Sequence, residues 1–77
     1  MTPLTPQEEA LMHELRKVAG AGHIVTARQL RDAGSAEKAA SIYNSDAAYP
    51  GSLLSRKLQI LRDKGHIEMR NGTYIIL

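Results

Sequence analysis

The chain lacks cysteine, tryptophan and phenylalanine, and three tyrosines are its only aromatic residues. Without cysteine it has neither disulfide bonds nor thiolate ligands for a metal ion. None of its apolar runs approaches the roughly 18–20 residues that cross a bilayer, so we expect no membrane contact. The opening stretch MTPLTPQEEA has neither the basic nor the apolar segment of a signal peptide, which favours a cytoplasmic protein.

Such a chain must fold on an apolar core alone. Its 77 residues are 43% hydrophobic and contain no low-complexity tract, a composition typical of a folded chain. A chain of this length buries only about 60% of its unfolded surface, so its stability is expected to be marginal. We expect a single domain over residues 1–77.

The net charge of +2 is unevenly distributed along the chain. Residues 1–40 carry five basic and five acidic side chains, whereas residues 41–77 carry five basic and three acidic ones. All of the excess positive charge therefore lies in the closing segment. This direction of charge is expected for a surface that binds a polyanion.

Helix signals stand at both ends of the segment TPQEEALMHELRKVAG. Thr5 is a capping residue, Pro6 suits the first helical position, and Glu8 completes a capping box. Gly20 ends the helix. Its apolar stripe consists of Leu11, Leu15 and Val18.

Shorter elements follow. The β-branched stretch at residues 23–25 predicts one short strand. Thr26 then caps a second helix, ARQLRDAG, with Gln29 at the capping-box position. A third helical segment, AEKAASIYN, opens after Ser35, and the stretch SDAAYPG predicts a loop.

The longest predicted helix after the first runs from about Ser52 to Lys64. Its core stripe has helical spacing and consists of Leu54, Leu58 and Leu61. A polar row lies opposite this stripe and consists of Ser52, Arg56, Gln59 and Asp63, with Ser55 and Ile60 at its margins. Asp63 either lies beyond the region that contacts a ligand or pairs with a neighbouring cation.

The segment HIEMRNGTYIIL predicts a β-hairpin. Asn71-Gly72 is the preferred pair for a two-residue type I′ turn, because both positions need positive φ. The resulting register places Arg70 opposite Thr73 and Ile67 opposite Ile76. One face of the hairpin then carries Ile67, Met69, Tyr74 and Ile76.

The order of helix, short strand, helix, helix, longer helix and hairpin is the layout of a winged helix-turn-helix. The expected fold is therefore α+β, with three to four helices, a small antiparallel sheet and a C-terminal β-hairpin wing. Residues 52–64 would be the recognition helix and residues 66–77 the wing. The short strand is expected to pair with the hairpin.

The closing segment LLSRKLQILRDKGHIEMRNGTYIIL resembles the end of many winged-helix domains. More narrowly, LQILRDKGHIE followed by NGTY is similar to the C-terminal winged-helix domain of the methyl-directed restriction endonuclease DpnI and the related Dam-replacing proteins, over about residues 49–77. In that family the domain accompanies a nuclease domain, and both contact adenine-methylated DNA. The resemblance implies a winged-helix fold that binds duplex DNA.

In this layout the exposed face of the last helix enters the major groove, and the wing touches the backbone or minor groove. Arg56 matches the guanine edge and Gln59 the adenine edge. Ser52 and Ser55 are short phosphate donors near the helix N-terminus. We therefore predict a protein that binds double-stranded DNA, acting as a small transcription regulator or as the recognition module of a larger system.

Further DNA contacts are expected from Lys57 on the helix and from Arg70 and Asn71 at the hairpin tip. Arg28 and Arg31 on the second helix are candidates for contact with the DNA backbone. For each of these cations the alternative is an ordinary solubilising charge. For Asn71 the alternative is turn geometry alone.

A different hypothesis is a winged-helix module that binds or inhibits another protein and does not bind DNA. The low net charge supports it, as do three acidic side chains near the N-terminus, Glu8, Glu9 and Glu14. Its contact surface would comprise Ile60, Leu53 and Ile75.

Catalysis is not expected. The three histidines, His13, His23 and His66, show no metal-ligand spacing, and the chain has neither a glycine-rich phosphate loop nor a nucleophile motif. We therefore expect no metal and no cofactor. Because a single module of this size usually binds DNA weakly, a homodimer or a larger protein partner is expected.

Overall fold

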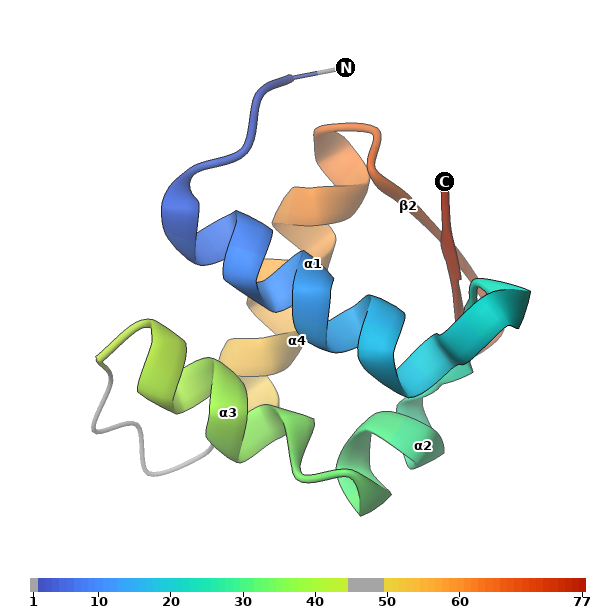
Figure 1. The fold of residues 1–77 in the computed structure, drawn as a ribbon, viewed down its shortest axis with the longest axis horizontal. Helices are drawn as coiled ribbons and strands as arrows, with labels where there is room; N and C mark the ends of the chain where they lie inside the picture. Colours follow the sequence, from blue (N-terminus) through green and yellow to red (C-terminus); the bar gives the residue numbers. More distant parts are fainter. Residues whose placement is uncertain (1, 45–49) are drawn as a thin grey trace.

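Four α-helices and a three-stranded antiparallel sheet form the part of the chain that the computed structural model describes, residues 2–44 and 50–77 (Figure 1). The elements follow in the order α1 (Pro6–Ala19), the 3-10 turn η1 (Gly20–Gly22), β1 (Ile24–Thr26), α2 (Ala27–Asp32), α3 (Ser35–Ile42), α4 (Pro50–Asp63), β2 (Ile67–Arg70) and β3 (Thr73–Ile76). The predicted α+β class is confirmed. Most of the predicted loop over residues 45–51 lies outside the described residues.

Both predicted capping boxes are present. At the start of α1, Glu8 N donates to Thr5 Oγ1 at 3.2 Å and Thr5 N donates to Glu8 Oε1 at 2.8 Å. At the start of α2, the same pair of bonds joins Thr26 and Gln29, at 3.1 and 2.9 Å. Each box satisfies two amides that helical hydrogen bonding leaves without a partner. Local chemistry therefore fixes where these two helices begin.

The hairpin has the predicted register. Arg70 lies opposite Thr73 and Ile67 opposite Ile76, and the two turn residues have positive φ, 48° at Asn71 and 79° at Gly72. The short strand β1 also pairs with β3, so the sheet order is β1-β3-β2. The predicted pairing between the short strand and the hairpin is thus confirmed.

Several predicted boundaries shift by one or two residues, among them those of α4 and β1. Helix α4 begins at Pro50 and not at Ser52, because proline needs no amide partner in the first helical turn and its fixed φ suits a helix. It ends at Asp63 and not at Lys64. The strand predicted at residues 23–25 is Ile24–Thr26, since His23 adopts a left-handed φ of 55° that no strand accommodates.

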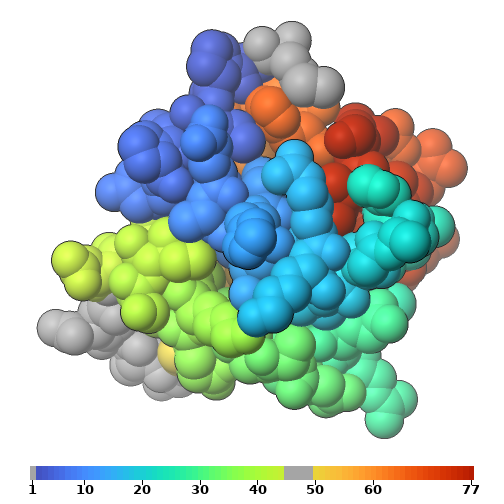
Figure 2. All heavy atoms as spheres, in the orientation of Figure 1, coloured from blue at the N-terminus to red at the C-terminus, as the bar shows by residue number. Residues whose placement is uncertain are grey.

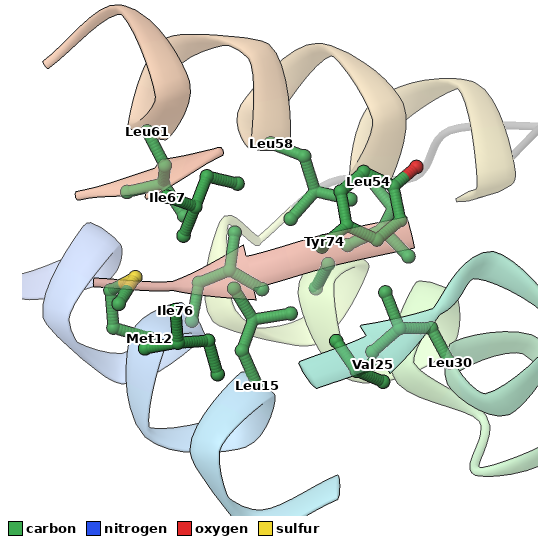
Figure 3. Close-up of a cluster of buried hydrophobic side chains, with 12 residues drawn as sticks. Met12, Leu15, Val25, Leu30, Leu54, Leu58, Leu61, Ile67, Tyr74 and Ile76 are labelled. Atoms are coloured by element: carbon green, nitrogen blue, oxygen red, sulfur yellow. The ribbon is translucent and has the colours of Figure 1, made fainter. Parts of the chain in front are cut away.

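The core lies between α1, α4 and the inner face of the sheet. The three predicted leucines of α4, Leu54, Leu58 and Leu61, are all buried. Figure 3 shows them beside Ile67, Tyr74 and Ile76 of the hairpin and above Met12 and Leu15 of α1. Burial of a large apolar side chain stabilises a fold by about 1.5–3 kcal/mol, so this cluster supplies most of the driving force for folding.

Helices α1 and α3 lie in front of α4 on the face shown in Figures 1 and 2. The leucine stripe of α4 points into the core beneath α1. The opposite side of α4 therefore faces away from α1, on the far side of the molecule.

Two of the acidic side chains near the N-terminus are buried and do not form a surface patch. Glu8 Oε1 accepts a hydrogen bond from Lys64 Nζ at 2.6 Å, and Glu14 Oε1 accepts from Lys38 Nζ at 3.2 Å. Ser35 Oγ also donates to Glu14, at 3.4 Å. These pairs tie α1 to α3 and to the end of α4. The acidic surface that would favour a protein partner is therefore reduced to Glu9.

Candidate nucleic-acid interface

The polar row on α4 is exposed along its whole length. Because the leucines occupy the opposite side of the helix, all members of the row remain in solvent, as does Ser55 at its margin: Ser52, Arg56, Gln59 and Asp63. At a rise of about 1.5 Å per residue, a helix of this size presents a rod about 20 Å long. Its two bidentate side chains, Arg56 and Gln59, therefore lie on an uncovered surface.

The negative charge on this row is partly compensated. Asp63 Oδ1 lies 3.3 Å from Arg62 Nη2, and both side chains are well exposed. An exposed pair of this kind contributes little to stability, but it lowers the local negative potential at the C-terminal end of the row. Asp63 is also two turns away from Ser55 and Arg56, which lie closer to the start of the helix.

Lys57 lies toward α3 and away from the polar row. Its Nζ sits 4.5 Å from the centre of the Tyr43 ring, a cation–π contact that holds the half-buried side chain over the end of α3. The Tyr43 hydroxyl is buried without a hydrogen-bond partner among the described residues. Burial raises the pKa of the Tyr43 phenol, and the Glu8 carboxylate adds to this increase.

At the hairpin tip, Arg70 and Asn71 are both exposed. Arg70 Nη2 lies 3.0 Å from Glu68 Oε2 on the outer face of the sheet. Asn71 has the positive φ that a type I′ turn requires, so the residue serves the geometry of the turn. An exposed amide side chain remains available at the tip.

The tip of the hairpin is attached to α2. Gly72 O accepts a 3.1 Å hydrogen bond from Ala27 N, the first residue of that helix. Arg28 and Arg31 follow on the exposed side of α2, one turn apart. The structure thus brings the hairpin tip and the start of α2, which carries these two arginines, close together, although about 40 residues separate them in the chain.

A hollow of about 340 Å³ lies between α2, α4 and β3. Arg28 and Arg31 line it from one side, and Ser55 lines it from α4. The two arginines of α2 therefore belong to the same surface as the polar row. The hollow itself was not expected, because the sequence has no local signal for a space between elements that are not consecutive.

The three histidines lie apart. His66 Nε2 is 2.7 Å from Thr2 O, and strand β3 separates β1 from β2, so His23 and His66 flank different edges of β3. Within residues 2–44 and 50–77, no three histidine or carboxylate side chains come together as metal ligands would. No helix in the same ranges is long and apolar enough to cross a membrane.

A scan against protein-family models, a search of curated proteins and a search of solved structures each found no match for this chain.

Proposed function

We propose that the chain is a winged helix-turn-helix that binds duplex DNA through α4, with the β2–β3 hairpin as its wing. The observation that carries this proposal is the uncovered polar row of α4, in which Arg56 and Gln59 stand one turn apart on the exposed side. The major groove is about 12 Å wide and admits one α-helix. The exposed flank of α4 has the size and the side chains for that position.

Each side chain on this surface has a distinct task. Arg56 reads a guanine through its O6 and N7 atoms, and Gln59 reads an adenine through N6 and N7. Ser52 and Ser55, in the first half of the helix, bind phosphate oxygens. Arg28 and Arg31 on α2 neutralise the backbone beside the groove, and the hairpin tip reaches the adjacent backbone.

The distribution of ion pairs is compatible with this function. Within the described residues, no ion pair involves Arg28, Arg31 or Arg56. The two buried carboxylates, in contrast, are neutralised by lysines on the other elements. Unpaired positive charge therefore lies on α2 and on the outer side of α4, and the exposed Arg16 and Lys17 of α1 carry a comparable charge outside the proposed interface.

Fluorescence anisotropy with labelled random duplex DNA tests the proposal at about 50 and 200 mM salt. We expect saturable binding at low salt that weakens steeply as salt rises. Arg56→Ala and Gln59→Ala should weaken binding to a selected site by about 1–3 kcal/mol each. The matched controls are Arg16→Ala and Gln7→Ala, which remove the same side chains from the exposed face of α1.

Absence of binding at low salt, or equal losses in the α1 and α4 variants, would overturn the assignment. The target sequence follows from selection on a random duplex library, run in parallel with and without adenine methylation.

A second candidate, a protein-binding module, is favoured by one observation on the outer face of the sheet. Ile24 is 53% exposed and Leu77 57% exposed. Ile75 pairs with Ile24 across the strands, and Leu77 follows Ile75 by two residues on an extended segment that still bonds to His66 O, so the three apolar side chains share one face. Leu53, which was predicted for such a surface, is only 7% exposed. Ile60, which was also predicted for this surface, is 38% exposed, so the hypothesis retains Ile60 on α4 and gains Ile24 and Leu77 on the sheet.

A further inference from the structure

The hollow between α2, α4 and β3 has an apolar floor. Its volume of about 340 Å³ is bounded below by Leu30, Leu54, Leu58 and Tyr74. Figure 3 shows Tyr74 beneath α4 next to Leu54, with the hydroxyl oxygen directed toward that helix. A space of this size is near the lower end of the range for small-molecule sites, about 300–1,000 Å³. It suits a molecule with one ring or one branched chain.

The rim of the hollow is positively charged. Arg28 and Arg31 stand three residues apart on α2, so both side chains lie on the same side of the helix. The Ser55 hydroxyl lies across from them, and Gly51, in the first turn of the 14-residue α4, also borders the space. The first turn of a helix carries partial positive charge, which adds to that of the arginines.

We propose that this hollow binds a small organic anion, a carboxylate carried on a compact apolar body. The leucines and the tyrosine ring enclose the apolar part, and the guanidinium groups bind the carboxylate through paired N–H donors. Inorganic phosphate satisfies the arginines but leaves the apolar floor in contact with water. A neutral ring of the same shape fills the floor but leaves the arginines without a counter-charge.

Binding in the hollow also has a consequence for DNA. Arg28, Arg31 and Ser55 line the hollow and belong to the proposed DNA-binding surface. An anion that occupies them excludes phosphate contacts from α2, so the ligand and DNA compete. This competition rests on the proposed function, whereas binding of the ligand to the isolated chain does not.

The test is a titration of the ¹⁵N-labelled 77-residue chain, without DNA, with benzoate, cyclohexanecarboxylate and 3-phenylpropionate. We expect saturable amide shifts confined to the hollow for at least one carboxylate, with Kd at or below about 1 mM. Benzamide and inorganic phosphate should each bind at least about tenfold more weakly, since each lacks one half of the recognition. Failure of all three carboxylates, or equal binding of benzamide, overturns the proposal.

Two variants locate the site. Arg28→Gln combined with Arg31→Gln should weaken carboxylate binding at least about tenfold, because the charge-assisted bonds are lost. Arg16→Gln combined with Lys17→Gln makes a similar change of charge on the exposed face of α1 and should leave binding unchanged. An equal loss of carboxylate binding in both double variants would show that binding depends on the net charge of the molecule, and it would overturn the assigned position.

Filling the hollow gives an independent check. Gly51 lines the hollow, and a Cβ added there meets no heavy atom within 4 Å, so Gly51→Leu adds an apolar side chain at the rim, where we expect it to obstruct the ligand. This variant should fold and lose carboxylate binding. The control is Gly22→Leu, also in open space but away from the hollow, and retained binding in both variants would contradict the site. If the carboxylate binds but does not displace DNA, the inferred competition is contradicted and the ligand site is not.

Discussion

Ala27 N donates a 3.1 Å hydrogen bond to Gly72 O, so the first residue of α2 is joined directly to the turn of the hairpin. This bond continues the β1–β3 ladder by one step beyond the strands. The bond links the hairpin tip to the start of the helix that carries Arg28 and Arg31.

Gly72→Ala should destabilise the fold by about 1 kcal/mol, because φ at this position is +79° and a side chain disfavours that conformation. The added Cβ meets no neighbour, so the cost is conformational and not steric. Urea unfolding followed by circular dichroism measures it. The control Gly22→Ala lies in equally open space without a positive φ; a loss of the same size there would contradict the explanation.

The pair of Glu8 and Lys64 should make stability depend on pH in the acidic range. The hydrogen bond from Lys64 lowers the pKa of Glu8 below its ordinary value of 4.5, and the bond from Thr5 N adds to this effect. A carboxyl whose pKa is lower in the folded state stabilises the fold above its unfolded pKa. That contribution is lost as the pH falls through the folded pKa.

Glu8→Gln should therefore reduce the free energy of unfolding at pH 7 by about 1–2 kcal/mol, and the difference from the wild type should shrink below about pH 4. Thermal unfolding at several pH values measures both. Glu9→Gln, which changes an exposed carboxylate next in sequence, should show little effect. A difference that stays constant from pH 7 to pH 3 would exclude the ionised pair as the cause.

Leu58→Ala should cost about 2–5 kcal/mol, because the side chain is almost fully buried among the core leucines and its removal leaves a cavity. In a chain of this size such a loss is enough to unfold much of the population. Ile60→Ala, two residues along the same helix but 38% exposed, should cost clearly less. Chemical denaturation compares the two, and equal costs would contradict the orientation of α4.

Salt dependence should separate the two kinds of DNA contact proposed for α2 and α4. Arg28→Gln should reduce the slope of log K against log salt by about 1 and weaken binding to all sequences alike, as loss of one phosphate contact does. Arg56→Ala should instead reduce the preference for one base pair of the selected site. Anisotropy titrations over a salt series measure both; the opposite assignment of effects would place α2, and not α4, in the groove.

Much of this architecture was predictable because it depends on residues close in sequence. The capping boxes and the Asn71-Gly72 turn are set by neighbours within three residues. The exposed row of α4 follows in the same way from the leucine spacing.

The structural features that the sequence did not indicate are contacts between residues far apart in the chain. Lys64 reaches Glu8 across 56 positions, and Lys38 reaches Glu14 across 24. The burial of Leu53 was likewise not predicted from the leucine pattern within α4. The hollow beside Arg28 arises from how α2, α4 and β3 meet, which no pattern within one segment encodes.

The capping box of α2 also affects how this molecule meets its own copies. Strand β1 lies at an edge of the sheet, where an exposed backbone can recruit a strand from another chain. Gln29 Oε1 already occupies the amide of Thr26, the last residue of that strand. A strand of another molecule that pairs with this edge therefore forms one hydrogen bond fewer, and the edge is only three residues long. Both features disfavour edge-to-edge aggregation through β1.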